Sequence, residues 1–171
     1  MAVKKLTGNT KVDVYNNTTY DIGYYVEGLK RREWMYGANP VVKIPLEEIE
    51  SALGDIGCYN MFSNNKLLIR DEDVREYLGL QPLDGVLTRE DVKLMLENGD
   101  IAAIDEALQV AKNTYDTRVL EMFTDLSVEL RITDFAVLGS IKEYTGKDVE
   151  EAIKDILEED KEKSIKKSTK K

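Results

Sequence analysis

The stretch KVDVYNNTTYDIGYYVEGLKRREWMYGANPVVKIPLEEIESALG, residues 11–54, decides the fold of the first half of this chain. Apolar and polar residues alternate at 11–15, which is typical of a strand with one buried face, and a strand at 32–36 would place Arg32, Trp34 and Tyr36 on one face. Residues 20–28 are rich in aromatic and β-branched side chains, which favours a strand, and the β-branched residues of VVKI at 41–44 favour a further short strand. Asparagine and threonine between the first two segments favour a turn, so we expect those two strands to pair as a hairpin.

A helix is predicted directly after the fourth strand. Pro45 suits the first helical position, and two glutamates follow it, where the helix dipole favours negative charge. Apolar residues then recur at helical spacing from Leu46 to Leu53, and Gly54 ends the element. Residues 66–70 form a further short strand, and 71–79 contain one or two helical turns in which Asp73 and Glu76 make a capping pair.

The second half is a series of helices separated by capping residues and glycines. The turn QPLDG, residues 81–85, separates it from the first half. Residues 127–132 alternate and predict either a connector or a single strand. The expected helix starts are marked by Thr88 with Asp91, Asp100, Thr114, Asp134, and Asp148 with Glu151.

We therefore expect an α+β fold: a small antiparallel β-sheet or open barrel with one helix, followed by a compact helical domain. The predicted domains are a β-rich N-terminal domain (1–81), a helical C-terminal domain (82–160) and a flexible lysine-rich tail (161–171). A chain of 171 residues accommodates two small domains of this kind.

The composition narrows the chemistry. The chain has no histidine and one cysteine, Cys58, which removes the commonest general base, Cys/His zinc sites and any disulfide within the chain. No glycine-rich phosphate loop is present, and no apolar run is long enough to cross a membrane. We expect a soluble protein that is not an enzyme and that binds no cofactor, metal or membrane, with Cys58 inert in the core.

Charge is distributed unevenly along the chain. The net charge is −9, and residues 161–171 carry six lysines against one glutamate, which leaves −14 on residues 1–160. A lysine-rich tail can bind DNA or an acidic protein surface. The alternative interpretation of these residues is a solvated, disordered terminus with no partner. The residues expected to bind a polyanion are Lys163, Lys166, Lys167, Lys170 and Lys171.

The segment KRREWMY, residues 30–36, places cations next to aromatic rings. Alternation puts Arg32, Trp34 and Tyr36 on one face of a strand, an arrangement that a single-stranded nucleic-acid groove also uses. The acidic body argues against nucleic acid and favours a core strand with a charged edge, or a surface that contacts a protein. The predicted partner-binding residues are Arg31, Arg32, Trp34 and Tyr36.

Two parts of the chain resemble small, uncharacterised proteins encoded by phages and prophages of Gram-positive bacteria. The first is residues 11–53, where a strand pair leads to an Arg-Arg-x-aromatic segment, a turn and a strand running into IPLEEI. The second is LSVELRITDFAVLGSIKEYTGKDVEEAIK, residues 126–154. The resemblance implies a phage setting, in the virion-structure gene cassette, and carries over no catalytic or binding residue.

These observations together predict a non-enzymatic phage virion-associated or assembly protein, located in the virion or the host cytoplasm. It would act by protein–protein contacts with a capsid, neck or tail component, and homo-oligomerisation stays open. The alternative is an acidic phage protein that inhibits a host DNA-binding or defence enzyme, because a strongly negative body can imitate the charge of DNA. An enzyme that uses carboxylates and tyrosine is the third possibility.

Overall fold

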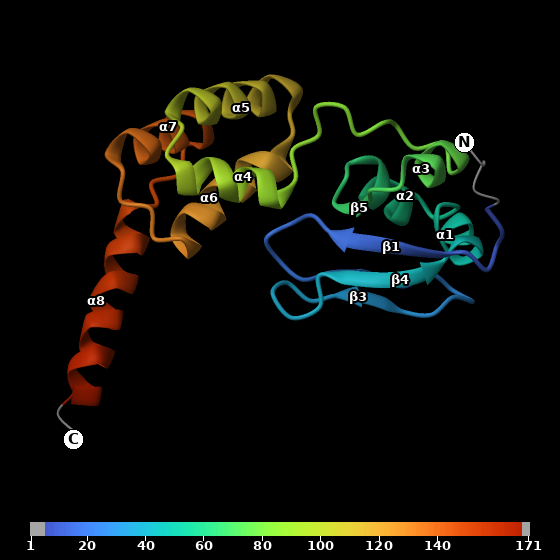
Figure 1. The fold of residues 1–171 in the computed structure, drawn as a ribbon, viewed down its shortest axis with the longest axis horizontal. Helices are drawn as coiled ribbons and strands as arrows, with labels where there is room; N and C mark the ends of the chain where they lie inside the picture. The colour runs from blue at the N-terminus through green and yellow to red at the C-terminus, as the bar shows by residue number, and fades with distance from the viewer. Residues whose placement is uncertain (1–5, 169–171) are drawn as a thin grey trace. The chain divides into compact units, whose positions relative to one another are not determined.

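The computed structural model describes residues 6–168, and the side chains of residues 6–163. Over these described residues the fold is α+β, as predicted, with two small antiparallel sheets and no closed barrel (Figure 1). The chain divides into two compact units, Met1–Val86 and Leu87–Lys171. The sequence predicted the boundary after residue 81, and the structure divides after Val86, so both positions lie in the short segment that connects the two units.

A three-stranded sheet forms the centre of the first unit. Strand β1 (Lys11–Asn16) lies between β4 (Val41–Pro45) and β5 (Leu67–Ile69), and both pairs are antiparallel. Strand β2 (Ile22–Tyr24) pairs instead with β3 (Arg32–Trp34), in a separate two-stranded sheet. The predicted hairpin between the first two strands is therefore wrong, because both edges of β1 are occupied by strands from further along the chain.

The polar turn that follows β1 is a buried network rather than a hairpin loop. The Asn16 side-chain oxygen accepts hydrogen bonds from the backbone N–H and the hydroxyl of Thr18, at 2.9 and 2.7 Å, while its amide donates to the Tyr20 carbonyl. The Asn17 backbone N–H donates to the Lys66 carbonyl at 2.9 Å. These bonds satisfy buried polar groups and direct the chain away from β1 into the second sheet.

Three helices belong to the first unit: α1 (Leu46–Ala52), α2 (Ile56–Ser63) and α3 (Glu72–Tyr77). The sequence predicted α1 and the helical turns of α3, so α2 is the helix that it missed. Pro45 is the N-cap of α1 rather than its first helical residue. The side chain of Asp55 caps α2, and Asp71, not Asp73, caps α3. Two glycines close to the start of α2 hid that helix from the sequence analysis, since glycine weakens the helical pattern.

The core of the first unit lies between the three-stranded sheet and its helices. Alternate residues of β1 face inward, and Trp34 of the second sheet enters the same core. The fully buried side chains include Val14, Trp34, Ile44, Ile49, Phe62 and Ile69.

The second unit consists of α4 (Arg89–Asn98), α5 (Ile101–Thr114), α6 (Thr117–Glu129), α7 (Phe135–Thr145) and α8 (Glu150–Ser168). Thr88 and Asp91 form the predicted capping box, and Asp100 and Asp134 cap their helices as expected. Thr114 does not begin a helix: it is the last residue of α5, and Asp116 caps α6. The alternating segment 127–132 continues α6 through Glu129 and then turns, so no strand forms there.

Helix α8 continues past the point where a flexible tail was predicted. Ile153 in its first half packs into a small apolar cluster with Val149, the residue just before the helix, and Arg131 forms an ion pair with Asp160 at 2.6 Å. The backbone is helical to Ser168, so residues 161–168 of the predicted tail belong to α8. Along residues 6–168, no helix combines the length and the apolar character needed to cross a membrane.

Candidate functional site

The β2–β3 hairpin presents two faces with different roles. Ile22 lies opposite Trp34, Gly23 opposite Glu33, and Tyr24 opposite Arg32. Directly opposed residues of an antiparallel pair share a face, and successive residues alternate between faces. Trp34, Tyr24 and Arg32 therefore belong to one face, and Glu33 belongs to the other.

The inner face of the hairpin is part of the core. Trp34 is fully buried, and its indole N–H donates to the Val14 carbonyl of β1 at 2.8 Å. The Tyr24 ring packs against the indole with 5.7 Å between ring centroids, and burial raises the pKa of its phenol. A side chain held in this way offers no surface to another protein, so Trp34 acts in the core of this unit.

Arg32 joins the hairpin to helix α1. Its guanidinium donates two parallel hydrogen bonds to the Glu48 carboxylate, each 2.6 Å long. The two side chains are only 20 % and 13 % exposed, so water screens this pair less than a surface pair. The hydrogen bonds from Arg32 lower the pKa of Glu48, and the bond to Glu48 raises the pKa of Arg32. The pair therefore acts as a clasp that fixes the position of the hairpin.

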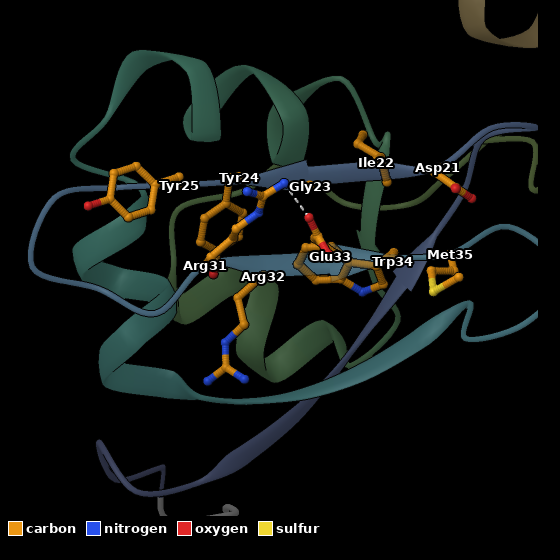
Figure 2. A pocket seen from close by; sticks show the side chains of 10 residues that line it. All are labelled: Asp21, Ile22, Gly23, Tyr24, Tyr25, Arg31, Arg32, Glu33, Trp34 and Met35. Atoms are coloured by element: carbon orange, nitrogen blue, oxygen red, sulfur yellow. Dashed lines mark ion pairs between the residues drawn. The ribbon is translucent and has the colours of Figure 1, made fainter.

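The outer face of the hairpin is open to solvent. It carries an ion pair between Arg31 and Glu33, 2.5 Å apart, whose side chains are 73 % and 57 % exposed. Tyr25 and Met35 flank this pair, as Figure 2 shows, with 72 % and 52 % of their surfaces exposed. Both strands line a shallow hollow of about 580 Å³ on the hairpin. We call Tyr25, Arg31, Glu33 and Met35, with Gly23 beneath them, the outer hairpin face.

Gly23 allows the two strands of this face to lie close together. A Cβ atom at this position would stand 2.6 Å from the Arg32 carbonyl oxygen and 3.2 Å from Cγ of Glu33. Real Cβ atoms do not approach a backbone oxygen so closely, so any side chain would push the strands apart. The glycine thus keeps the floor of the hollow flat beneath the Arg31–Glu33 pair.

The four residues predicted to bind a partner separate in space. Arg31 lies on the outer hairpin face, whereas Arg32 and Trp34 face the body of the unit. Tyr36 follows the strand, half-buried, and its backbone N–H donates to Asp21 at 2.6 Å. Sequence reasoning did not select Tyr25 or Met35, although its alternation pattern placed Met35 on the same face as Arg31.

The predicted polyanion-binding lysines fall at the end of α8. Lys163 forms an ion pair with Glu159 in the same helix at 3.2 Å, and both side chains are exposed. Lys166 and Lys167 belong to the backbone of α8, but their side chains lie outside the described residues. Lys170 and Lys171 also lie outside the described residues.

Metal-binding clusters and a reactive cysteine are two features that could carry chemistry in the described part of the chain. Within it, no three residues of the His, Cys, Asp or Glu types come together as metal ligands. Cys58 is buried, and burial together with Asp55 raises its thiol pKa to about 11, which keeps it protonated and unreactive at neutral pH. The inert core role predicted for Cys58 agrees with this environment.

Comparison of the chain with protein-family models, curated proteins and solved structures finds no match. The phage resemblance consequently stays a prediction. The functional interpretation below depends on the geometry of the residues themselves.

Proposed function

We propose that this protein is a non-enzymatic phage virion-associated or assembly protein that binds a capsid, neck or tail component through its outer hairpin face. One observation carries the proposal. Two large apolar side chains, Tyr25 and Met35, are mostly exposed on either side of a solvated ion pair, on a hairpin whose opposite face is buried.

The composition of this face suits a protein interface. Tyrosine, methionine and arginine are the side-chain types enriched where proteins meet, and here they occupy one surface of a single hairpin. The exposed Arg31–Glu33 pair contributes little to stability, so Arg31 can exchange Glu33 for a carboxylate of a partner at low cost. Tyr25 and Met35 would then lose water on binding, which supplies the hydrophobic part of the affinity.

The hairpin is held in place before any partner arrives. Trp34 anchors it to β1, and the Arg32–Glu48 clasp anchors it to α1. A preorganised surface loses little conformational entropy on binding. Stable interfaces bury about 800 Å² on each partner, more than one small hairpin face offers, so the contact would be completed by repeated copies in a particle.

The contact surface can be tested with a matched pair of variants. Tyr25→Ser combined with Met35→Ser removes the apolar part of the outer hairpin face without touching the core. The control is Tyr115→Asn, which removes an even more exposed tyrosine from the helical unit, at a positive φ that asparagine tolerates. We expect the double variant to lose incorporation into particles, or cross-links to a particle protein, while the control retains both.

Mass spectrometry of purified particles tests the phage setting itself. The proposal requires this protein in particles or in assembly intermediates at a fixed ratio to a capsid, neck or tail protein. Absence from both would refute the structural role. Loss of incorporation by Tyr115→Asn equal to that of the double variant would instead refute the assignment of the contact to the hairpin.

A second candidate function is supported by the position of the acidic residues. Residues 87–160 carry 19 acidic and 8 basic side chains, a net charge of −11, whereas residues 1–86 carry only −3. Negative charge concentrated on one compact unit could imitate DNA and occupy a host DNA-binding or defence enzyme. This function predicts a complex with a host nuclease that weakens as salt is added, together with absence from particles.

A contact of the lysine-rich end with DNA or an acidic surface forms a further part of the proposal. Because α8 extends to Ser168, truncation after Asp160 would cut the helix and confuse the result. Changing the five lysines at 163, 166, 167, 170 and 171 to glutamine preserves a helix-forming side chain. DNA binding that is unchanged in this variant would rule out the contact.

A further inference from the structure

The loop between α4 and α5 contains the only Asn-Gly pair in the sequence, Asn98-Gly99. Asn98 is the last residue of α4, and Gly99 caps the helix in the left-handed conformation, with φ of 63°. Both residues are exposed. We infer that Asn98 is a site of spontaneous deamidation, which converts this position into a mixture of aspartate and isoaspartate.

The reaction needs only water as a co-reactant. The backbone nitrogen of Gly99 attacks Cγ of Asn98, and the new N–Cγ bond closes a five-membered succinimide ring. The Cγ–Nδ2 bond breaks, and ammonia leaves with the proton that the Gly99 amide gives up. Water then opens the ring at either of its two carbonyl carbons, which yields aspartate or isoaspartate.

Three features of the structure favour this reaction at Asn98. The Asn98 side chain makes no hydrogen bond to another described residue, so its amide group can turn toward the backbone. The Gly99 N–H is held by a single long bond to the Leu96 carbonyl, at 3.3 Å. Open space surrounds the position where a Cβ of residue 99 would stand, so nothing blocks the approach to the Gly99 nitrogen.

Other asparagines of the chain lack this combination. The side chains of Asn16, Asn17 and Asn65 are engaged in hydrogen bonds. Asn113 is exposed, but it is followed by the β-branched Thr114, whose N–H belongs to helix α5. Asn113 is therefore an internal control for exposure without a following glycine. The helix end at Asn98 must fray before the ring can close, so the folded chain reacts more slowly than the unfolded chain.

Deamidation would change the connection between two helices. A new carboxylate at the C-terminus of α4 lies at the negative end of the helix dipole, which is unfavourable. Isoaspartate also adds a methylene group to the backbone, two residues before Asp100, whose side chain caps α5 by accepting from Ala103 N–H at 3.2 Å. We expect the modified protein to show a lower unfolding midpoint for the helical unit and an unchanged midpoint for the unit that contains Trp34.

The experiment follows the full chain in mildly alkaline buffer, folded and in denaturant, by peptide mapping with separation of aspartate and isoaspartate forms. The inference expects both products to accumulate at Asn98 in the folded chain, several-fold faster than deamidation at Asn113, and faster still in denaturant. Asn98→Gln should abolish the products in that peptide. An intact Asn98 in the folded chain over the time in which the denatured chain reacts, or a rate no higher than that of Asn113, would overturn it.

Discussion

Breaking the Arg32–Glu48 clasp should destabilise the first unit, and a double-mutant cycle measures by how much. The perturbations are Arg32→Met, Glu48→Gln and the combination of both. Arg32→Met removes the guanidinium that donates both hydrogen bonds, each 2.6 Å long, whereas Glu48→Gln removes the negative charge and one of the two accepting oxygens; both side chains are mostly shielded from water. The cycle isolates the interaction between the two side chains from the effect of each change alone.

The expected coupling energy follows from the burial of the pair. Exposed ion pairs contribute about 0.2–1 kcal/mol, whereas removing one partner of a fully buried pair costs about 3–5 kcal/mol. Side chains that are 20 % and 13 % exposed lie between these limits. A bidentate, charge-assisted contact of this kind should therefore give a coupling of about 2 kcal/mol.

The assay is urea denaturation followed by the fluorescence of Trp34, which is the only tryptophan of the chain and is buried in the affected unit. The unfolding free energy falls by about 1–2 kcal/mol per molar urea, so a coupling energy of this size corresponds to a shift of about 1–2 M in the urea concentration at the unfolding midpoint. The Arg31–Glu33 pair is the matched control, because its side chains are 73 % and 57 % exposed, and its cycle should give about 0.5 kcal/mol or less. Equal coupling in the two cycles would refute the reasoning from burial.

The clasp also predicts a dependence of stability on pH. The pKa of Glu48 lies below its ordinary value of 4.5 in the folded protein, because the carboxylate accepts hydrogen bonds from Arg32. A lowered pKa means that the unfolded chain binds the proton more tightly, so this contribution is complete above 4.5 and is lost as the pH falls through the folded-state pKa. The stability difference between the native protein and Glu48→Gln should shrink across that range, and a constant difference would contradict the assignment.

Three further predictions use the same spectroscopic separation of the two units. Gly23→Ala should cost about 1–3 kcal/mol by Trp34 fluorescence, because its Cβ would stand 2.6 Å from a backbone oxygen, and an unchanged midpoint would contradict this. Arg75→Leu should lower the stability of the first unit by about 2–4 kcal/mol, since the buried guanidinium donates hydrogen bonds to oxygens of Gln81, Ile69 and Asn65. The same change should speed proteolysis after Gln81, and an equal rate of proteolysis would contradict the role of Arg75 in holding that segment. Asp91→Ala removes one half of a capping box and should cost the helical unit about 1 kcal/mol by circular dichroism, and a shift in the Trp34 transition instead would contradict the separation into units.

Local sequence signals determined the elements that depend on neighbouring residues. Alternation identified β1 and the two faces of β3, because side chains on a strand alternate whatever its partner is. It did not decide whether the face of Trp34 is buried, and the sequence analysis counted Trp34 among the partner-binding residues, whereas the structure buries it. The sequence also predicted the capping box of Thr88 with Asp91 and the caps Asp100 and Asp134. These signals are local, because a capping side chain and the backbone N–H from which it accepts lie within one helical turn. Thr114 was misread because a threonine suits a helix start in sequence but here ends α5.

The outer hairpin face could be predicted only in part. The sequence identified the segment and separated Arg31 from Arg32 by strand alternation. It did not indicate that Glu48 would bind Arg32 across 16 positions, or that Tyr25 of the opposite strand would complete the exposed face. Those facts depend on which strand pairs with which and on where the helix returns, and neither is encoded locally.

The sequence by itself determined an α+β chain with a β-rich first half, a capped helical second half and the residue types available for chemistry. Only the tertiary structure decided that β1 lies between β4 and β5, and that the polar turn after it is buried rather than the loop of a hairpin. The physical reason is that turn residues act locally, because they favour a change of chain direction through contacts with their immediate neighbours. Strand pairing, in contrast, is selected by burial among residues far apart in the chain. That selection placed Arg32 and Trp34 against the body of the unit and left Tyr25, Arg31, Glu33 and Met35 exposed to solvent.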